Sequence, residues 1–351
     1  MPEGGAVSHA LPMTARSARA AASLQRALLL ALLALVACLF SPRAQADTCT
    51  ASMTPITFPA VNPILGAAVA GQGTLTVSCD FTSALAIGAL VCVNLGAGAN
   101  GQQDPRLMSN AGSAVRLQYR LSQNSNMSPV WGTVTSGQPI QLTFIRPLLG
   151  GQPPAQSVTI YGQVLPNQFT VPTVNNATTT YTEAFSGNAT LNYLFYTVTL
   201  ANCSSVPLVR TVPFTVSAPV TNNCTISTSQ NMVFDGAGTR SLLNSPIDAS
   251  ATLAVRCTNN DAYRIRLDGG RYGTVAQRYM QRTGGTQRIP YALYTNSTRT
   301  TLWGDGTGGT NFFTATGTGN IQTVTVYGRV PAQPAPVPGS YSDTVTATIE
   351  F

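Results

Sequence analysis

The sequence predicts an all-β protein built from two tandem sandwiches, and three observations support this expectation. Short segments alternate between apolar and polar residues, as where Leu75, Val77 and Cys79 alternate with threonine and serine. No segment combines an apolar stripe of helical period with helix caps at both ends. The same module also occurs twice, because Arg106-Leu107-Met108 returns as Arg278-Tyr279-Met280 at an offset of 172 residues. Two homologous domains of roughly 150 residues each are therefore expected.

The repeat runs without a gap through the middle of each copy. The cysteine pair Cys49 and Cys79 corresponds to Cys224 and Cys257. Further matched positions are Tyr119 with Tyr291, Trp131-Gly132 with Trp303-Gly304 and Tyr161-Gly162 with Tyr327-Gly328. Residues that recur at the same place in both copies favour a structural role, whereas residues present in only one copy are where a private function is expected.

The first 46 residues are expected to form a secretory signal peptide. Arg16, Arg19 and Arg26 precede an apolar run from Ala27 to Phe40, and Ala44-Gln45-Ala46 is a small-x-small cleavage site; Met13 is an alternative start. The run is too short to favour a retained membrane helix, and no later segment has the length and hydropathy of a membrane span. The first domain is then expected over residues 47–220 and the second over residues 221–351.

Composition argues against catalysis and nucleic-acid binding. After residue 46 the chain has 15 basic and 11 acidic residues with no basic run. It has no lysine, and its only histidine, His9, lies in the signal peptide, which excludes Ser-His-Asp, Cys-His and histidine-ligated metal sites. The acidic residues of the first domain are far apart in sequence, so neither an enzyme nor a cofactor is expected. Asp261, Asp268 and the glycines that follow lack the order of a calcium loop and favour a plain turn.

The cysteines indicate export to an oxidising compartment. Six remain after the signal peptide, and the CxxC spacing of metal-binding sets is absent. The repeat proposes the disulfides Cys49–Cys79 and Cys224–Cys257, because each pair closes a similar loop at the equivalent place. Cys92 and Cys203 are then left for each other, within the first domain only.

Two alternating segments differ between the copies. The C-terminal segment has a wholly apolar face and runs to the last residue, which leaves no chain to cover a neighbouring sheet edge. This face comprises Val345, Ala347, Ile349 and Phe351. A second segment, residues 211–220, lies between the domains and has no counterpart after the second domain; an ordinary linker is the alternative, because two prolines weaken the strand prediction. Its apolar phase comprises Val212, Phe214, Val216, Ala218 and Val220.

A set of motifs in the second half of the chain carries a family resemblance. The motifs are Arg278-Tyr-Met, Ile289-Pro-Tyr-Ala-Leu-Tyr, Leu302-Trp-Gly-Asp-Gly, Val324-Thr-Val-Tyr-Gly-Arg-Val and Gly339-Ser-Tyr-Ser-Asp. Residues 212–351 resemble the spore coat protein U domain, also called the secreted pili protein domain. The first half is a weaker match, with insertions and with Tyr181-Thr-Glu-Ala-Phe in place of the Gly-x-Tyr-x-Asp ending. The whole is similar to the two-domain tip subunits of archaic chaperone-usher pili.

The resemblance implies that the second domain is an immunoglobulin-like sandwich lacking its last strand, which the N-terminal extension of the next pilin subunit fills. It also implies that residues 211–220 complete the first domain in cis. Only Asp47 and Thr48 precede Cys49 in the mature chain, so the subunit is expected to accept a strand, offer none and lie at the end of a fibre. The implied partners are a periplasmic chaperone, an outer-membrane usher and the next pilin. The implied location is an extracellular, cell-surface pilus reached through the periplasm.

Large apolar residues in predicted loops of the first domain are the candidate surface-binding residues. They are Ile64, Leu65, Leu148, Leu149, Phe169 and Val171. Clustered at the free end of the domain, they would attach the fibre to a hydrophobic surface or a host receptor and so support biofilm formation, as hydrophobic loops are thought to do in the tip adhesins that this chain resembles. The alternative is that they pack onto the core. Two alternatives to a tip adhesin also stay open: a non-tip pilus adaptor, and a coat or matrix protein that no usher assembles.

Overall fold

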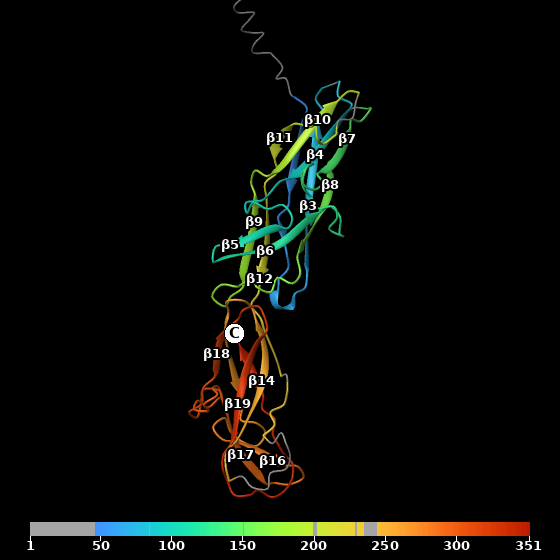
Figure 1. Cartoon of the computed structure of the whole chain (residues 1–351). Coiled ribbons are helices and arrows are strands. Elements are labelled where there is room, and N and C mark those ends of the chain that lie inside the picture. Colours follow the sequence, from blue (N-terminus) through green and yellow to red (C-terminus); the bar gives the residue numbers. More distant parts are fainter. Residues whose placement is uncertain (1–45, 84, 150, 199–201, 229, 235–243) are drawn as a thin grey trace, which may run out of the picture. The chain divides into compact units, whose positions relative to one another are not determined.

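The computed structural model describes residues 46–351 except 84, 150, 199–201, 229 and 235–243. The expected signal peptide, residues 1–46, therefore lies outside the described residues apart from Ala46. Thr48–Phe351 forms one compact unit, in which the described residues are strands and loops with one short 3-10 helix at Pro63–Leu65. No helix in the described part of the chain has the length and hydropathy needed to cross a membrane. The all-β prediction is confirmed (Figure 1).

Strands β1 to β12 form two sheets around one hydrophobic core, which together we name the first sandwich. The larger sheet has the order β1 (Thr48–Met53), β3 (Val69–Asp80), β8 (Gln156–Val164), β6 (Ser113–Ser122), β5 (Arg106–Asn110), β9 (Thr179–Phe185), β12 (Phe214–Val220) and β2 (Ile56–Thr57). The smaller sheet has the order β11 (Leu208–Thr211), β10 (Ala189–Tyr196), β4 (Gly88–Leu95) and β7 (Ile140–Ile145). Most strands bury alternate residues, as their sequence alternation predicts, but β4 is buried at every position.

Strands β13 to β21 form the second sandwich, again two sheets around a core of their own. The larger sheet has the order β13 (Cys224–Thr228), β14 (Ile247–Cys257), β19 (Gln322–Val330), β17 (Arg288–Tyr294), β16 (Arg278–Arg282) and β20 (Tyr341–Ser342). The smaller sheet has the order β18 (Phe313–Thr316), β15 (Ala262–Leu267) and β21 (Ala347–Glu350). The chain thus contains two tandem immunoglobulin-like sandwiches, as the sequence repeat and the family resemblance predict.

The recurring arginine and tryptophan build the same scaffold in both sandwiches. Trp131 is buried and donates its indole N–H to the carbonyl of Val93 at 3.0 Å, and Arg106, also buried, donates to the carbonyl of Trp131 at 2.9 Å. Trp303 and Arg278 repeat both bonds at 2.9 Å and 3.0 Å. Burial lowers the pKa of each guanidinium, and the carbonyl acceptors around it compensate part of that desolvation. These residues therefore serve the fold and not a private function, as their recurrence predicts.

A tyrosine–carboxylate pair is a second shared feature. Tyr119 donates its phenolic O–H to Glu183 at 2.5 Å, and Tyr291 donates to Asp343 at 2.6 Å. The two carboxylates occupy equivalent places, because β9 in one sandwich and the segment that begins with β20 in the other both pair with the strand that carries the buried arginine. Burial raises the pKa of Glu183 above its ordinary value.

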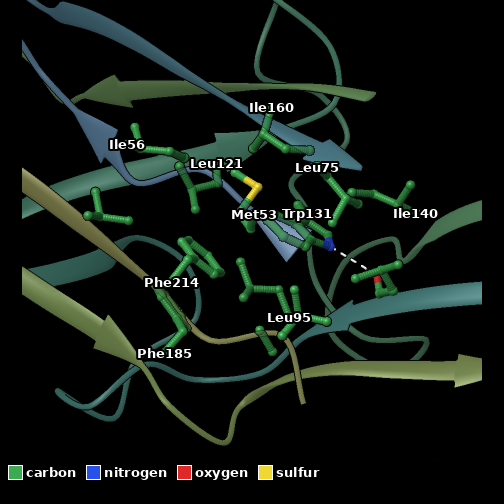
Figure 2. Packing of buried hydrophobic residues seen from close by; sticks show 14 of the residues in the cluster. Met53, Ile56, Leu75, Leu95, Leu121, Trp131, Ile140, Ile160, Phe185 and Phe214 are labelled. Carbon is green, nitrogen blue, oxygen red and sulfur yellow. Dashed lines mark hydrogen bonds between the residues drawn. The ribbon is translucent and has the colours of Figure 1, made fainter. Parts of the chain in front are cut away.

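Aromatic packing concentrates at the centre of the first sandwich. Figure 2 shows Phe214 between Trp131 and Phe185, with aliphatic side chains from several strands around them. The ring centroid of Phe214 lies 5.8 Å from that of Trp131 and 4.6 Å from that of Phe185, and both pairs of rings are stacked. Since Phe214 belongs to β12, the segment between the two halves supplies part of the first core.

The three predicted disulfides are present. Cys49–Cys79 joins directly opposed residues of β1 and β3, and Cys224–Cys257 does the same for β13 and β14. Cys92–Cys203 joins β4 to the segment between β10 and β11, and this bridge has no counterpart in the second sandwich.

Candidate functional site

The segment after β10 completes the first sandwich. β12 lies between β9, with which it pairs antiparallel from Phe214↔Phe185 to Val220↔Thr179, and β2, with which it pairs in parallel. Backbone N–H groups of Phe58 and Val61 donate to β12 carbonyls, each at 2.8 Å. The apolar phase predicted for this strand is buried at every position: Val212, Phe214, Val216, Ala218 and Val220. The segment is an inner strand of the sheet, and the linker alternative is wrong.

Among the described residues of the second sandwich, no strand lies at the places that β11 and β12 occupy in the first. In the first sandwich β11 lies beside β10 and β12 lies beside β9. In the second, β21 and β20 are the counterparts of β10 and β9, and each is the outermost strand of its sheet among the described residues. Apolar residues along this side are only partly covered by the described part of the chain. The predicted edge residues Val345, Ala347 and Ile349 are half-buried, and Phe351 is exposed.

The predicted surface-binding residues fall into two groups, one largely covered by the protein and one fully exposed. Ile64 and Val171 are buried, and Phe169 is half-buried beneath the guanidinium of Arg256 at 4.4 Å. Ile64 lies in the 3-10 helix, where its carbonyl accepts a bond from Arg256 at 3.4 Å. The prediction that these three side chains are exposed adhesive residues is wrong, because the 3-10 helix around Ile64 and the turn from Gln168 to Val171 place them against the protein. Leu65 is exposed but belongs to the same segment.

The other predicted residues, Leu148 and Leu149, are fully exposed at 103% and 102% of their reference areas. They follow β7, and further exposed apolar residues lie on the neighbouring strand ends. We name this set the apolar end: Leu85, Ile87, Ile145, Leu148, Leu149 and Val198. Sequence reasoning missed four of the six, although each is an apolar residue of one copy at a strand end.

Strand pairing brings the three segments of the apolar end together. Gly88, the first residue of β4, pairs with Ile145 at the end of β7 and with Tyr196 at the end of β10. The backbone N–H of Ile87 donates to the carbonyl of Tyr196, and that of Arg146 donates to the carbonyl of Ile87, both at 3.0 Å. Figure 1 shows the ends of β10, β4 and β7 and their loops beside one another.

The apolar end and the segments around Ile64 and Phe169 lie at opposite ends of the first sandwich. The chain enters β9 at Thr179, opposite Val220, and leaves β10 at Tyr196 (Figure 1). A bridge between Val61 and Val220 places the 3-10 helix segment beside the start of β9. The apolar end is therefore well separated from the turn segments that bury Ile64 and Val171.

The loops of the apolar end carry little charge, although the exposed Asp80 at the end of β3 directly precedes one of them. Arg146 is the one charged residue within the described parts of residues 81–87, 145–155 and 197–198. It is half-buried, and its guanidinium donates to the carbonyl of Ser83, so it links the loop before β4 to the loop after β7. The arrangement offers exposed apolar area on a hydrogen-bonded frame, which suits contact with an apolar surface.

Nothing in the described part of the chain gathers three or more His, Cys, Asp or Glu residues that could hold a metal ion. Asp268, weighed above as part of a calcium loop, accepts bonds from the backbone N–H groups of Gly270 and Thr346, each at 2.9 Å. Asp261 accepts a bond from the hydroxyl of Thr173. Both aspartates therefore have structural partners.

Comparison with known proteins places these features in a family. A family model, the Spore Coat Protein U domain, matches residues 35–197 and again residues 210–348. Protein U of Myxococcus xanthus is 34% identical over 125 residues, which are 34% of this chain and 68% of that protein. The second match begins at residue 210 and so takes in β12, which pairs within the first sandwich.

Two solved structures are also similar, at low identity. One is the chaperone–tip adhesion subunit pre-assembly complex from archaic chaperone-usher Csu pili of Acinetobacter baumannii, at 18% identity and a TM-score of 0.48, over 87% of this chain and 100% of that chain. The other is the CupB6 tip adhesin of Pseudomonas aeruginosa, at 11% identity and a TM-score of 0.39, over 87% of this chain and 93% of that chain.

Proposed function

The chain belongs to the spore coat protein U domain family, and we propose that it is the tip subunit of a chaperone-usher pilus that attaches cells to apolar surfaces and supports biofilm formation. One observation carries the proposal: the two copies of the module differ in completeness. β11 and β12 flank β10 and β9 in the first sandwich, whereas β21 and β20 are outermost strands of the second among the described residues. The first copy acts as a finished domain, and the second accepts a strand.

Donor-strand complementation follows from the chemistry of these open edges. An outermost strand presents unpaired backbone N–H and C=O groups, and the half-buried face of Val345, Ala347 and Ile349 adds apolar side chains beside them. An extended segment with alternating apolar residues satisfies both needs at once. We assign that role to a periplasmic chaperone during export and to the N-terminal extension of the next pilin in the fibre, with an outer-membrane usher exchanging one for the other.

The position of β12 supports the tip assignment. The second family match begins at residue 210, so β12 occupies the N-terminal part of the second module. In this chain that part is inserted into the sheet of the preceding sandwich. It acts as a donor strand given in cis, with the domain boundary after Val220. β1 starts at Thr48, two residues after the expected cleavage site at Ala46.

The apolar end supplies the attachment surface. Leu148 and Leu149 are fully exposed, and the neighbouring exposed residues before β4, at the end of β7 and after β10 extend the patch. Contact with an apolar abiotic surface or an apolar host receptor removes this area from water. Because Arg146 is the one charged residue of the described loops there, attachment should persist at high salt.

Paired serine substitutions test this proposal. Leu148→Ser/Leu149→Ser should reduce attachment of piliated cells to hydrophobic plastic at both low and high salt, with unchanged pilin on the cell surface. Leu65→Ser is the matched control, because Leu65 is 65% exposed but lies outside the apolar end. Undiminished attachment by the double variant would show that the apolar end is not the binding surface. Immunogold labelling along the whole fibre would favour the adaptor, and surface display without chaperone and usher would favour the coat protein.

A further inference from the structure

The outer face of the smaller sheet is built differently in the two sandwiches. In the second, Arg264 and Arg266 on β15 point outward, where both pair with Glu350 on β21. The residues at the same places in the first are Cys92 and Asn94 on β4, because Trp131 and Trp303 mark the same register through bonds to Val93 and Ile265. The outer face of β15 in the second sandwich is therefore exposed and ion-paired, whereas the corresponding face of β4 in the first sandwich is covered.

The cover consists of the segment between β10 and β11. Leu90, Cys92 and Val206 are buried together, with Tyr196 and Cys203 packed against them, as a small cluster separate from the main core. This explains why β4 is buried at every position, since its second face lies beneath this segment. The side-chain amide of Asn192 also holds the segment there, because it donates to the carbonyl of Val206 at 3.1 Å.

The covering segment also carries a member of the apolar end. Val198 follows Tyr196 at the end of β10 and is 86% exposed. Its chain is fixed on one side by β10, through the pairing of Tyr196 with Gly88, and on the other by Cys203. Within the described part of this segment, the disulfide is the covalent anchor, supported by one buried apolar side chain and one side-chain amide.

We propose that Cys92 and Cys203 are positioning residues of the apolar end, and that their disulfide, five residues along the chain from Val198, restrains the position of Val198 for attachment. This inference rests on the proposed function, because it assigns a structural requirement to the same surface. Without the bridge, Val206 and the Asn192 bond still hold the described part of the segment on the sheet, and Val198 loses its covalent restraint on the C-terminal side, so it can occupy more positions. Attachment then costs the entropy of ordering it again.

The two other disulfides serve the fold instead. Cys49 and Cys79 are buried and join strands that are already paired along their length, as do Cys224 and Cys257. Cys203 is half-buried in a loop and takes part in no strand pairing described above, so removing this bridge should leave the strand pairings of the first sandwich in place. The proposal therefore predicts that removing this bridge weakens attachment while the first sandwich still folds and unfolds cooperatively.

A double-mutant cycle tests the proposal on the full mature chain in piliated cells. Three variants are compared with the wild type: Val198→Ser, Cys92→Ala/Cys203→Ala, and the two combined. Removing the bridge should weaken attachment by about tenfold, equivalent to about 1.4 kcal/mol, with pili still assembled and cooperative unfolding retained. Val198→Ser should weaken attachment in the disulfide-bonded protein and add little once the bridge is gone, because the loop is then no longer held in place. Wild-type attachment without the bridge, or fully additive losses, would overturn the proposal.

A second measurement covers the case in which the cysteine variant is not secreted. Assembled wild-type pili are treated with a dithiol, which becomes a disulfide as it supplies two electrons and two protons to Cys92–Cys203; the thiols are alkylated and identified by mass spectrometry. Pili alkylated only at Cys92 and Cys203 should attach less well, and equal attachment would overturn the proposal. Leu148→Ser/Leu149→Ser separates the two failures. If that variant attaches normally the proposed function fails, and if it attaches poorly while bridge-free protein attaches normally only this inference fails.

Discussion

Replacing Phe214 by alanine measures how much the first sandwich depends on β12. Phe214 is 6% exposed and stacks on Phe185 and Trp131 at 4.6 Å and 5.8 Å. Truncating a buried phenylalanine costs about 3–5 kcal/mol, and its two aromatic contacts place this site at the upper end of that range. A loss of about 4 kcal/mol is a large fraction of the stability of a domain of this size.

The chain has two tryptophans, one in each core, which allows each sandwich to be followed separately. In a Trp303→Phe background, the fluorescence of Trp131 reports unfolding of the first sandwich. With a urea dependence of about 2 kcal/mol per molar, Phe214→Ala should lower the unfolding midpoint by about 2 M. Phe312→Ala is the matched control, because Phe312 is half-exposed in the second sandwich. A shift for Phe214→Ala no larger than that of the control would refute the assignment of β12 as part of the first core.

Three further outcomes are expected, each with its own measurement. A mature chain that ends after Val220 should melt cooperatively and one that ends after Arg210 should not, since only the first contains β12; equal melting curves in circular dichroism would contradict this. Arg106→Lys should cost about 3 kcal/mol in urea unfolding, because lysine cannot satisfy the carbonyls of Leu95, Gly96 and Trp131 together, whereas Arg116→Lys should change little. Burial raises the pKa of Glu183, so the folded state binds the proton of this carboxyl more tightly than the unfolded state does. The free energy of unfolding should therefore fall as the pH rises from 4.5 through the folded pKa. Glu183→Gln should remove this pH dependence, and a variant with an unchanged pH profile would exclude Glu183 as its source.

The sequence predicted the fold because the informative residues recur. Trp131 and Trp303, Arg106 and Arg278, and the paired cysteines lie at matched places, and each matched pair makes the same contacts in the structure. Alternation of apolar and polar residues also predicted a strand over residues 212–220, and all its apolar residues are buried in the structure. Correspondences between the two copies were harder to identify where insertions change the offset between them. The sequence set Tyr181-Thr-Glu in the place of Tyr341-Ser-Asp, and the bonds to Tyr119 and Tyr291 show that Glu183 and Asp343 have the same structural role.

The candidate site was predicted less well, because exposure in a loop depends on contacts distant in sequence. Ile64, Leu65, Phe169 and Val171 lie among the same kinds of residues as Leu148 and Leu149, yet only Leu65 of the four is exposed. The difference is set by neighbours such as Arg256, which is far away in the chain and covers the ring of Phe169. Pairing of β4 with β7 and β10 is equally nonlocal, so the neighbouring members of the apolar end could not be grouped from sequence.

The central claim, that the second sandwich is an open acceptor for a donor strand, is tested most directly by supplying that strand. In a Trp131→Phe background, the mature chain is extended after Phe351 by a flexible linker and a second copy of residues 211–220, with Trp303 as the reporter. Burial of the apolar phase of a donor strand is worth on the order of 5 kcal/mol, so at about 2 kcal/mol per molar the urea midpoint of Trp303 should rise by about 2.5 M. The same extension with its apolar phase replaced by serine should leave the midpoint unchanged. If both extended chains unfold like the chain without an extension, the second sandwich is already complete and the account is contradicted.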